Sequence, residues 1–182
     1  MEIITIDGPG GVGKGTLALY LADKLDFNYL NSGALYRSIG YIADLKSIDL
    51  TDEKMLISIT QSITFKLNKA SKNTEIMYEN KNINKQLFNE KTAKTASKIA
   101  SISSLRKSIV NIQRAFAEEP GLVAEGRDMG SIIFPDAIIK LFLTANTKTR
   151  AKRRHKQLKE KGINVSLSQL IDELEARDKR DT

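Results

Sequence analysis

The segment GPGGVGKGT, residues 8–16, combines residue types that together can bind phosphate groups. Gly8, Gly13 and Lys14 match the pattern GxxxxGK[ST], but the hydroxyl that the pattern expects next arrives one residue late, at Thr16. Glycines allow backbone N–H groups to surround an anion, and the lysine adds a positive charge beside it. This segment is therefore a candidate for binding the terminal phosphates of a nucleotide.

The residues on either side of the loop predict the elements that would hold it in place. EIITID, residues 2–7, is a short β-branched run typical of a strand, and TLALYLADKL, residues 16–25, carries apolar residues at helical spacing. A helix that begins at the loop points the positive end of its dipole at a bound anion. Strand, glycine turn and helix are the context of a P-loop, so we predict that the loop binds a nucleoside triphosphate. The alternative is a purely structural turn.

Two further segments place cationic or polar side chains where a ligand could bind. NSGALYR, residues 31–37, puts Ser32 at a predicted helix start and Arg37 about a turn and a half further along. AEGRDMG, residues 124–130, follows an apolar run, so Arg127 and Asp128 lie at the carboxyl end of a predicted strand, where doubly wound sheets bind ligands. Either segment alone could also be a surface turn.

The pattern along the chain predicts an α/β fold with a doubly wound parallel sheet and helices on both faces. The apolar runs at 122–126 and 137–145 read as strands that are covered on both faces. Alternating residues at 63–68 and 74–83, joined by a turn at 69–73, predict a small inserted antiparallel lobe. The other predicted elements are a strand at 27–30 and helices at 31–45, at 51–62 with Thr51 as N-cap, at 85–117 in two pieces that meet near 101–104, at 146–161 and at 166–180.

Composition excludes several classes of function. The 182 residues include no cysteine and one histidine, His155, which argues against disulfide frameworks, thiol catalysis and histidine-rich metal sites. No apolar run approaches the ~20 residues that a membrane span needs, so we expect no membrane partner. The acidic start of the chain lacks the basic region of a signal peptide. We expect a single domain over residues 1–182 in a cytoplasmic setting.

The net charge of +7 admits either a nucleic-acid partner or a small phosphate ligand. Residues 146–161 hold eight Lys or Arg and one Glu, and Arg150, Arg153 and Arg154 share one helical face, opposite a more apolar stripe that includes His155. A solvated helix face is the plain interpretation, and a short arginine-rich lid over phosphates, at about 146–165, is the functional one. Because exposed aromatic residues and a known module are missing from this stretch, we expect no nucleic-acid partner.

Taken in order, the segments closely resemble the bacterial cytidylate kinase family. The pieces that carry the resemblance are IDGPGGVGKGT, NSGALYR, TAKTASKIASISSLR, QRAF, PGLVAEGRDMGSIIFPDAIIKLFLTA and the ending RDKRD. Because the loop ends in GKGT in many nucleoside monophosphate kinases, the late hydroxyl of Thr16 marks a subtype of P-loop. The resemblance implies transfer of the γ-phosphoryl group of ATP to CMP or dCMP, with Mg²⁺ as cofactor, by a monomer. It also identifies the inserted lobe, about 50–85, as the monophosphate-binding lobe.

The resemblance implies a role for each matching residue. ATP would be bound by Gly8, Pro9, Gly10, Gly11, Val12, Gly13, Lys14, Gly15 and Thr16, with Thr16 also a ligand of Mg²⁺. CMP would be bound by Ser32, Arg37, Ser97, Arg106, Gly126, Arg127, Asp128, Arg180 and Asp181. The charge that develops during transfer would be stabilised by Lys14, Arg127, Arg150, Arg153, Arg154 and Arg177.

The chain departs from the family pattern in two ways. Asn31 and Glu125 stand where aspartate is common, and both replacements look compatible with function. The relatives also continue beyond Thr182 with a last strand and a helix, so we expect the strand at 138–143 to lie at the edge of the sheet, with lowered stability and a tendency to associate. Two alternatives therefore stay open: another small-molecule P-loop kinase, or a nucleotide-binding form with weak catalysis. A regulatory GTPase is disfavoured because no NKxD pattern occurs.

Overall fold

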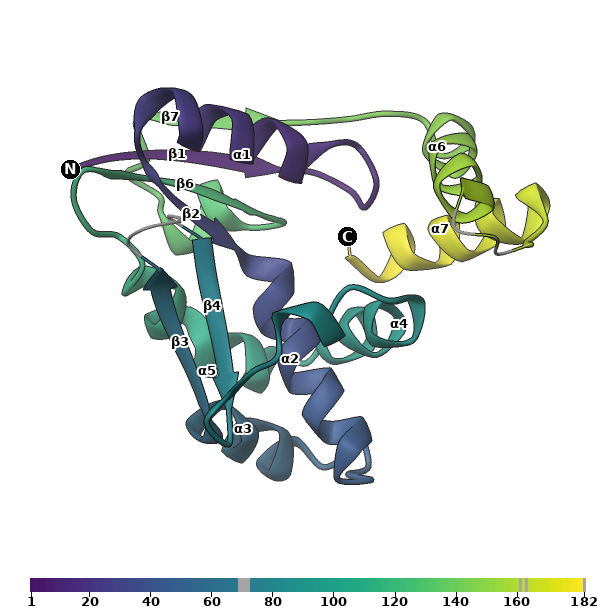
Figure 1. Cartoon of the computed structure of the whole chain (residues 1–182), viewed down its shortest axis with the longest axis horizontal. Coiled ribbons are helices and arrows are strands. Elements are labelled where there is room, and N and C mark those ends of the chain that lie inside the picture. Colours follow the sequence, from purple (N-terminus) through teal and green to yellow (C-terminus); the bar gives the residue numbers. More distant parts are fainter. Residues whose placement is uncertain (69–72, 161, 163, 182) are drawn as a thin grey trace.

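The central sheet is parallel, and the N-terminus of the chain leads directly into it (Figure 1). The computed structural model describes residues 1–68, 73–160, 162 and 164–181, so most of the turn predicted at 69–73 lies outside the described residues. The strands are β1 (Glu2–Asp7), β2 (Asn28–Asn31), β6 (Gly121–Gly126) and β7 (Ile139–Phe142). Within the described residues their order is β2-β6-β1-β7, and every neighbouring pair is parallel. The predicted α/β class and parallel sheet are confirmed.

Helices cover both faces of this sheet. Successive side chains of a strand point to opposite faces, so neighbouring residues of the buried strand β6 pack against different helices. Val123 of β6 packs toward α1 (Lys14–Leu25) together with Ala18. Its neighbours Leu122 and Ala124 pack on the opposite face, against α2 (Ser32–Leu45) and α5 (Ser103–Arg114). The predicted doubly wound arrangement is therefore confirmed.

The prediction that the run at 137–145 is buried on both faces is wrong. Ile138, Ile139 and Phe142 are 57%, 45% and 69% exposed, although Leu141 and Leu143 pack against the cluster under α1. The reason is topological, since β7 is the last strand in the described order and has a described neighbour, β1, on one side only, which leaves its side chains less covered. The expected edge position of this strand is confirmed by the same order.

The smaller sheet is antiparallel, and among the described residues its strands pair only with one another; it is called the lobe below. It consists of β3 (Ile63–Asn68), β4 (Asn73–Tyr78) and β5 (Lys81–Asn82), which follow helix α3 (Glu53–Ser62). The antiparallel arrangement predicted for 63–68 and 74–83 is confirmed, but the second segment is divided into two strands, because Glu79 and Asn80 have φ angles of 47° and 61° and turn the chain back. Asparagine tolerates this left-handed conformation better than most residues.

The start of α3 differs from the prediction by one residue. Asp52, not Thr51, is the N-cap, and its side chain accepts a hydrogen bond from the Met55 amide at 3.0 Å. The hydroxyl of Thr51 instead donates to the carboxylate of Asp49 at 2.8 Å. An aspartate is at least as good an N-cap as a threonine, so the adjacent carboxylate takes the position.

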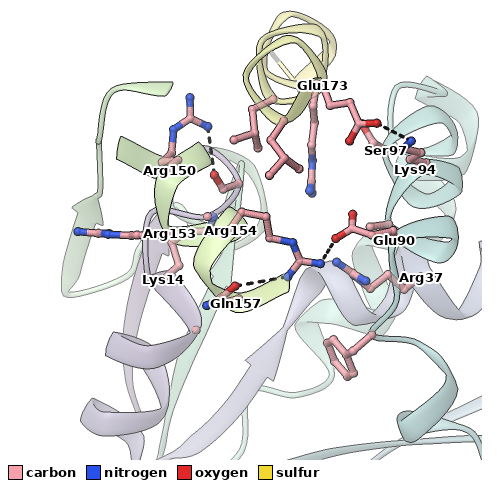
Figure 2. A pocket seen from close by; sticks show the side chains of 18 of the residues that line it. Lys14, Arg37, Glu90, Lys94, Ser97, Arg150, Arg153, Arg154, Gln157 and Glu173 are labelled. Carbon is pink, nitrogen blue, oxygen red and sulfur yellow. Dashed lines mark hydrogen bonds and ion pairs between the residues drawn. The ribbon is translucent and has the colours of Figure 1, made fainter. Parts of the chain in front are cut away.

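The last two helices, α6 (Thr147–Glu160) and α7 (Leu167–Asp181), pack together as a pair that is called the lid below; it extends beyond the lid expected at about 146–165. Ala151, Leu158 and Leu170 give this helix pair its own small core. Figure 2 shows the lid facing α4 (Glu90–Ile99) across a cavity, with Lys94 of α4 paired to Glu173 of α7 at 2.7 Å. No described helix is long and apolar enough to cross a membrane.

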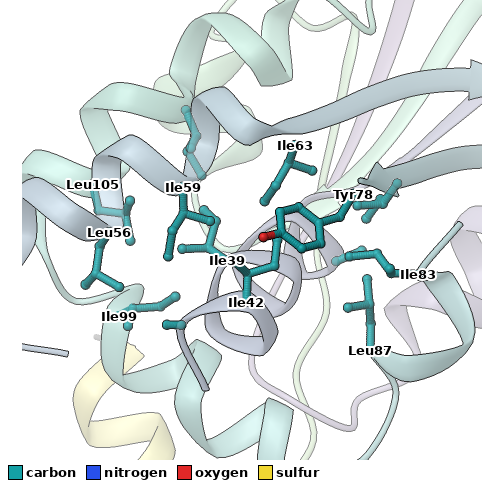
Figure 3. Close-up of a cluster of buried hydrophobic side chains, with 14 residues drawn as sticks. Ile39, Ile42, Leu56, Ile59, Ile63, Tyr78, Ile83, Leu87, Ile99 and Leu105 are labelled. Carbon is teal, nitrogen blue, oxygen red and sulfur yellow. The ribbon is translucent and has the colours of Figure 1, made fainter. Parts of the chain in front are cut away.

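The largest apolar cluster joins the lobe to the helices that carry the site (Figure 3). Ile39 and Ile42 of α2 are fully buried there, together with Ile99 of α4 and Leu105 of α5. Burial of side chains of this size contributes about 1.5–3 kcal/mol each. The cluster therefore holds α2, α4 and α5 at constant positions, and these helices bear the arginines and serines of the candidate site.

Candidate active site

The glycine loop has the backbone conformation that its residue types predict. Gly8 and Gly13 have φ angles of 138° and 102°, and a Cβ at Gly8 would lie 2.1 Å from the carbonyl oxygen of Leu143. Gly13 is the N-cap of α1, so the helix begins at Lys14 directly after the turn. The amides of the first helical turn, which have no carbonyl partner within the helix, therefore follow directly after the glycine turn.

Lys14 is folded onto the loop that precedes it. Its Nζ donates to the carbonyl oxygens of Gly8 at 2.7 Å and Pro9 at 2.9 Å, and the side chain is buried. Burial, followed by the positive charge of Arg127, lowers the pKa of Lys14 to about 7. An anionic ligand at this position would favour the charged ammonium, because nearby opposite charge stabilises it.

Arg127 and Asp128 lie beside the glycine loop because the turn that carries them is attached to β1. The carboxylate of Asp7 accepts from the amides of Met129 at 2.9 Å and Gly130 at 2.8 Å. Arg127 in turn donates from Nη1 to the carbonyl oxygen of Gly8 at 2.7 Å. The predicted phosphate-binding arginine is therefore in contact with the P-loop.

A cavity of about 200 Å³ lies between this turn and the helices α2, α4 and α5. An ion pair between Arg106 Nη2 and Asp128 Oδ2, at 2.6 Å, forms part of its wall, and Tyr36 lies beside that pair. The predicted CMP-binding residues that line this cavity are Ser32, Arg37, Ser97, Arg106, Gly126, Arg127, Asp128 and Arg180. The side chain of Asp181, the remaining member of that set, lies outside the described part of the chain.

A second cavity, of about 850 Å³, lies between the glycine loop, α4 and the lid. Of the predicted ATP-binding residues, those that line it are Gly10, Gly11, Gly13, Lys14, Gly15 and Thr16, whereas Gly8, Pro9 and Val12 are not among its lining residues. Arg37, Ser97, Arg177 and Arg180 line both cavities. The two cavities therefore adjoin, and cationic side chains stand at their boundary.

Comparison with known proteins identifies the family of this chain. The sequence model of the family described as Cytidylate kinase matches residues 4–182. This chain belongs to the cytidylate kinase family. It is 48% identical to the cytidylate kinase of Pseudomonas syringae pv. tomato, over 99% of this chain and 80% of the relative. It is 46% identical to that of Nitrosomonas europaea, over 100% and 80%, and 41% identical to that of Photobacterium profundum, over 98% and 78%.

The lid arginines of this cytidylate kinase family member point in different directions (Figure 2). Arg150 is 3% exposed, donates to the carbonyl oxygen of Gly10 at 3.1 Å and is paired with Asp178. Arg153 lies 3.5 Å from the carbonyl oxygen of Val12. The three arginines share one helical face as predicted, but their guanidinium groups do not come together. An arginine side chain is long enough to extend toward a separate hydrogen-bond or ion-pair partner.

Arg154 instead reaches toward α4, where it pairs with Glu90. Arg37 lies nearby, donating to the carbonyl oxygen of Leu87 at 2.9 Å, and burial, followed by the charges of Arg177 and Arg154, lowers its pKa to about 10. Arg37, Arg154 and Arg177 thus lie in one region of the cavity wall together with Glu90. Such an arrangement binds an additional anion readily, because each bound negative charge relieves the repulsion among the guanidinium groups.

Sequence reasoning missed the carboxylates that organise the site. Tyr29 donates from its hydroxyl to Glu125 Oε1 at 2.5 Å, and burial raises the pKa of Glu125. A Cβ at Gly15 would lie 3.1 Å from the same Oε1, so Glu125 stands directly beside the P-loop. In the sequence, Glu125 stands out only as a departure from the family pattern, and the roles of Asp7 and Glu90 depend on contacts between segments far apart in the chain.

Proposed function

We propose that this protein transfers the γ-phosphoryl group of ATP to CMP or dCMP, giving ADP and CDP or dCDP. The observation that carries the proposal is the pair of adjoining cavities, one lined by the P-loop and the other by the Arg106–Asp128 ion pair, with arginines at their boundary. Two nucleotides bound in this way would meet at their phosphates. Membership of the cytidylate kinase family supports the same substrate pair.

The smaller cavity has the groups that cytosine requires. The N4 amino group of cytosine donates hydrogen bonds, so it needs an acceptor such as the carboxylate of Asp128. Its O2 and N3 atoms accept, so they need donors such as Arg106 or Ser97. Uracil has an acceptor oxygen at position 4 and a donor at N3, so donor and acceptor are exchanged at these two positions. We therefore expect UMP to be a poor substrate.

Phosphoryl transfer in this site needs positioning and positive charge more than a protein nucleophile. An oxygen of the CMP phosphate, already an anion, forms a bond to the γ-phosphorus while the bond from that phosphorus to the β–γ bridging oxygen breaks, and ADP leaves. Lys14 would exchange its contacts with the Gly8 and Pro9 carbonyls for phosphate oxygens. Arg127, Arg37 and Arg177 would stabilise the charge that spreads over the transferred group.

The residues around Thr16 fit a magnesium ion held mainly by the nucleotide. Thr16 is exposed at the start of α1 and lines the larger cavity. The described residues contain no cluster of three or more His, Cys, Asp or Glu that could hold a metal alone. Mg²⁺ commonly takes one or two protein ligands and completes its shell with phosphate oxygens and water. When bound, the ion would neutralise phosphate charge, with the Thr16 hydroxyl as its protein ligand.

The lid would exclude water from the reacting phosphates. The Lys94–Glu173 and Arg154–Glu90 pairs connect the lid to α4 across the larger cavity (Figure 2). A water molecule that reached the γ-phosphate would compete with CMP, so an enclosed site favours transfer over hydrolysis.

The proposal is tested by following ADP release from ATP with CMP, dCMP, UMP or AMP as acceptor. We expect rapid release with CMP and dCMP, slow release with UMP and AMP, and loss of the CMP-dependent signal in Lys14→Ala. Efficient turnover of UMP or AMP with poor turnover of CMP would show that the protein is a different nucleotide kinase. Release of ADP at the same rate without any acceptor would show an ATP hydrolase instead.

A further inference from the structure

Asp7 occupies an unusual position at the carboxyl end of β1, one residue before the glycine loop. Its side chain is buried, with 8% of the residue exposed. The two carboxylate oxygens accept from two consecutive amides, Oδ1 from Met129 at 2.9 Å and Oδ2 from Gly130 at 2.8 Å. Both carboxylate oxygens of Asp7 therefore accept hydrogen bonds from a segment more than a hundred residues away in the chain.

The bonded amides open the short π-helical turn η2 (Met129–Ile133). Within this turn the amide of Ile132 donates to the Asp128 carbonyl at 2.9 Å and that of Phe134 to the Met129 carbonyl at 2.7 Å. The first amides of any helical turn have no carbonyl within the turn to bind. Met129 is fully buried, so water is a poor substitute, and Asp7 caps the turn from a neighbouring strand.

The turn also fits closely against the strands beneath it. A Cβ at Gly130 would lie 2.6 Å from Thr5 Oγ1, and a Cβ at Gly126 would lie 2.8 Å from Met129 Cγ. Arg127 adds a second connection to the same part of β1 through the Gly8 carbonyl. Residues 126–130 are therefore held against residues 5–8 by packing and by charged hydrogen bonds at once.

We propose that Asp7 is a positioning residue for base selection, which sets the direction of the Asp128 carboxylate by holding the next two amides of the chain. Asp128 directly precedes Met129, so a rotation of the turn would move its carboxylate away from Arg106. The inference rests on the proposed function, since it assigns Asp7 to the cytosine-reading group. It differs from a merely structural role, which would lower turnover of every acceptor alike.

The test uses Asp7→Asn, which keeps the size of the side chain but replaces one acceptor oxygen by a donor that opposes an amide. We expect the ratio of kcat/KM for CMP to that for UMP to fall by about tenfold, the scale of one hydrogen bond to a charged group. The charge of Asp7 also acts on Lys14. That effect cancels in the ratio, because both acceptors use the same ATP site.

Asp136→Asn is the matched control, because Asp136 is an exposed aspartate that follows the same turn. We expect it to keep the wild-type ratio. In a background of Asp128→Asn, Asp7→Asn should change the ratio little further, since the two residues act as one unit. An unchanged ratio in Asp7→Asn, equal losses for CMP and UMP, or full additivity with Asp128→Asn would overturn the proposal.

A second measurement does not depend on catalysis. Amide hydrogen exchange of Met129 and Gly130 should be faster in Asp7→Asn than in the wild type and unchanged in Asp136→Asn. Unchanged exchange in Asp7→Asn would refute the capping role, whatever the activity of the variant. If exchange is faster in the variant but the wild type does not phosphorylate CMP, the capping role stands and the proposed function is refuted. Asp7→Ser, which keeps one small acceptor, replaces Asp7→Asn in both measurements should the amide prevent folding.

Discussion

Replacing Asp128 by asparagine should lower the preference for cytosine over uracil. The carboxylate of Asp128 can only accept hydrogen bonds, whereas an amide can also turn a donor toward the ring. The amino group of cytosine would then face a donor, and the O4 oxygen of uracil would gain one. Arg106, which donates to Asp128 at 2.6 Å, can still donate to the amide oxygen, so the wall of the cavity should keep its shape.

The size of the effect follows from the environment of Asp128. Hydrogen bonds to charged groups contribute roughly 1.5–3 kcal/mol, and the side chain of Asp128 is 18% exposed, so solvent screens it partly. The lower end of that range, about 1.5–2 kcal/mol, corresponds to a loss of roughly 10- to 30-fold in kcat/KM for CMP. A new neutral hydrogen bond to uracil should raise kcat/KM for UMP by about threefold. The CMP-to-UMP ratio should therefore fall by about 30- to 100-fold.

The assay is steady-state ADP release with CMP and UMP varied separately at saturating ATP. Asp136→Asn serves as the control, since it removes an exposed carboxylate from the loop that follows the same turn. The KM for ATP should stay near its wild-type value in both variants, because Asp128 lines the smaller cavity and is not among the lining residues of the larger one. If Asp128→Asn kept the wild-type ratio of CMP to UMP, Asp128 would not be the residue that reads position 4 of the base.

Three other predictions concern the phosphate site, the lid and the sheet edge. Lys14→Ala should lower phosphoryl transfer roughly 100-fold or more while thermal unfolding shows a retained fold; near-normal rates would exclude Lys14 as the phosphate lysine. Lys94→Gln with Glu173→Gln removes a partly exposed pair worth about 0.2–1 kcal/mol, so acceptor-free ATP hydrolysis should rise up to about fivefold; an unchanged rate would show that the pair does not help close the lid. Phe142→Lys should lower self-association in sedimentation experiments without changing turnover, and equal association would show that the β7 edge is not involved.

The sequence predicts those parts of the molecule that depend on neighbouring residues. The glycine loop follows from the spacing of Gly8, Gly13 and Lys14 and from the strand and helix beside it. Arg127 and Asp128 are found in the same way, because residues after a buried strand lie at the ligand-binding edge of a parallel sheet. These local rules place the candidate ligand-binding residues at one edge of the sheet before any tertiary contact is known.

Other features cannot be read from local pattern because they depend on which segments meet. Asp7 looks like an ordinary strand end, and its role appears only where β1 and the turn at Met129 come together. The apolar run that contains Phe142 has the composition of a buried strand, but its exposure is set by its place at the edge of the sheet. The directions of Arg150 and Arg154 likewise follow their partners, Asp178 and Glu90, rather than helical spacing.

The most direct test of the central claim is to follow the label from [γ-³²P]ATP in the presence of CMP. The proposed reaction predicts that the label appears in CDP, in an amount equal to the ADP formed, because the enclosed site between the P-loop and the lid directs the phosphoryl group to the second nucleotide. Label that appears as inorganic phosphate, with CMP unchanged, would contradict transfer between two bound nucleotides.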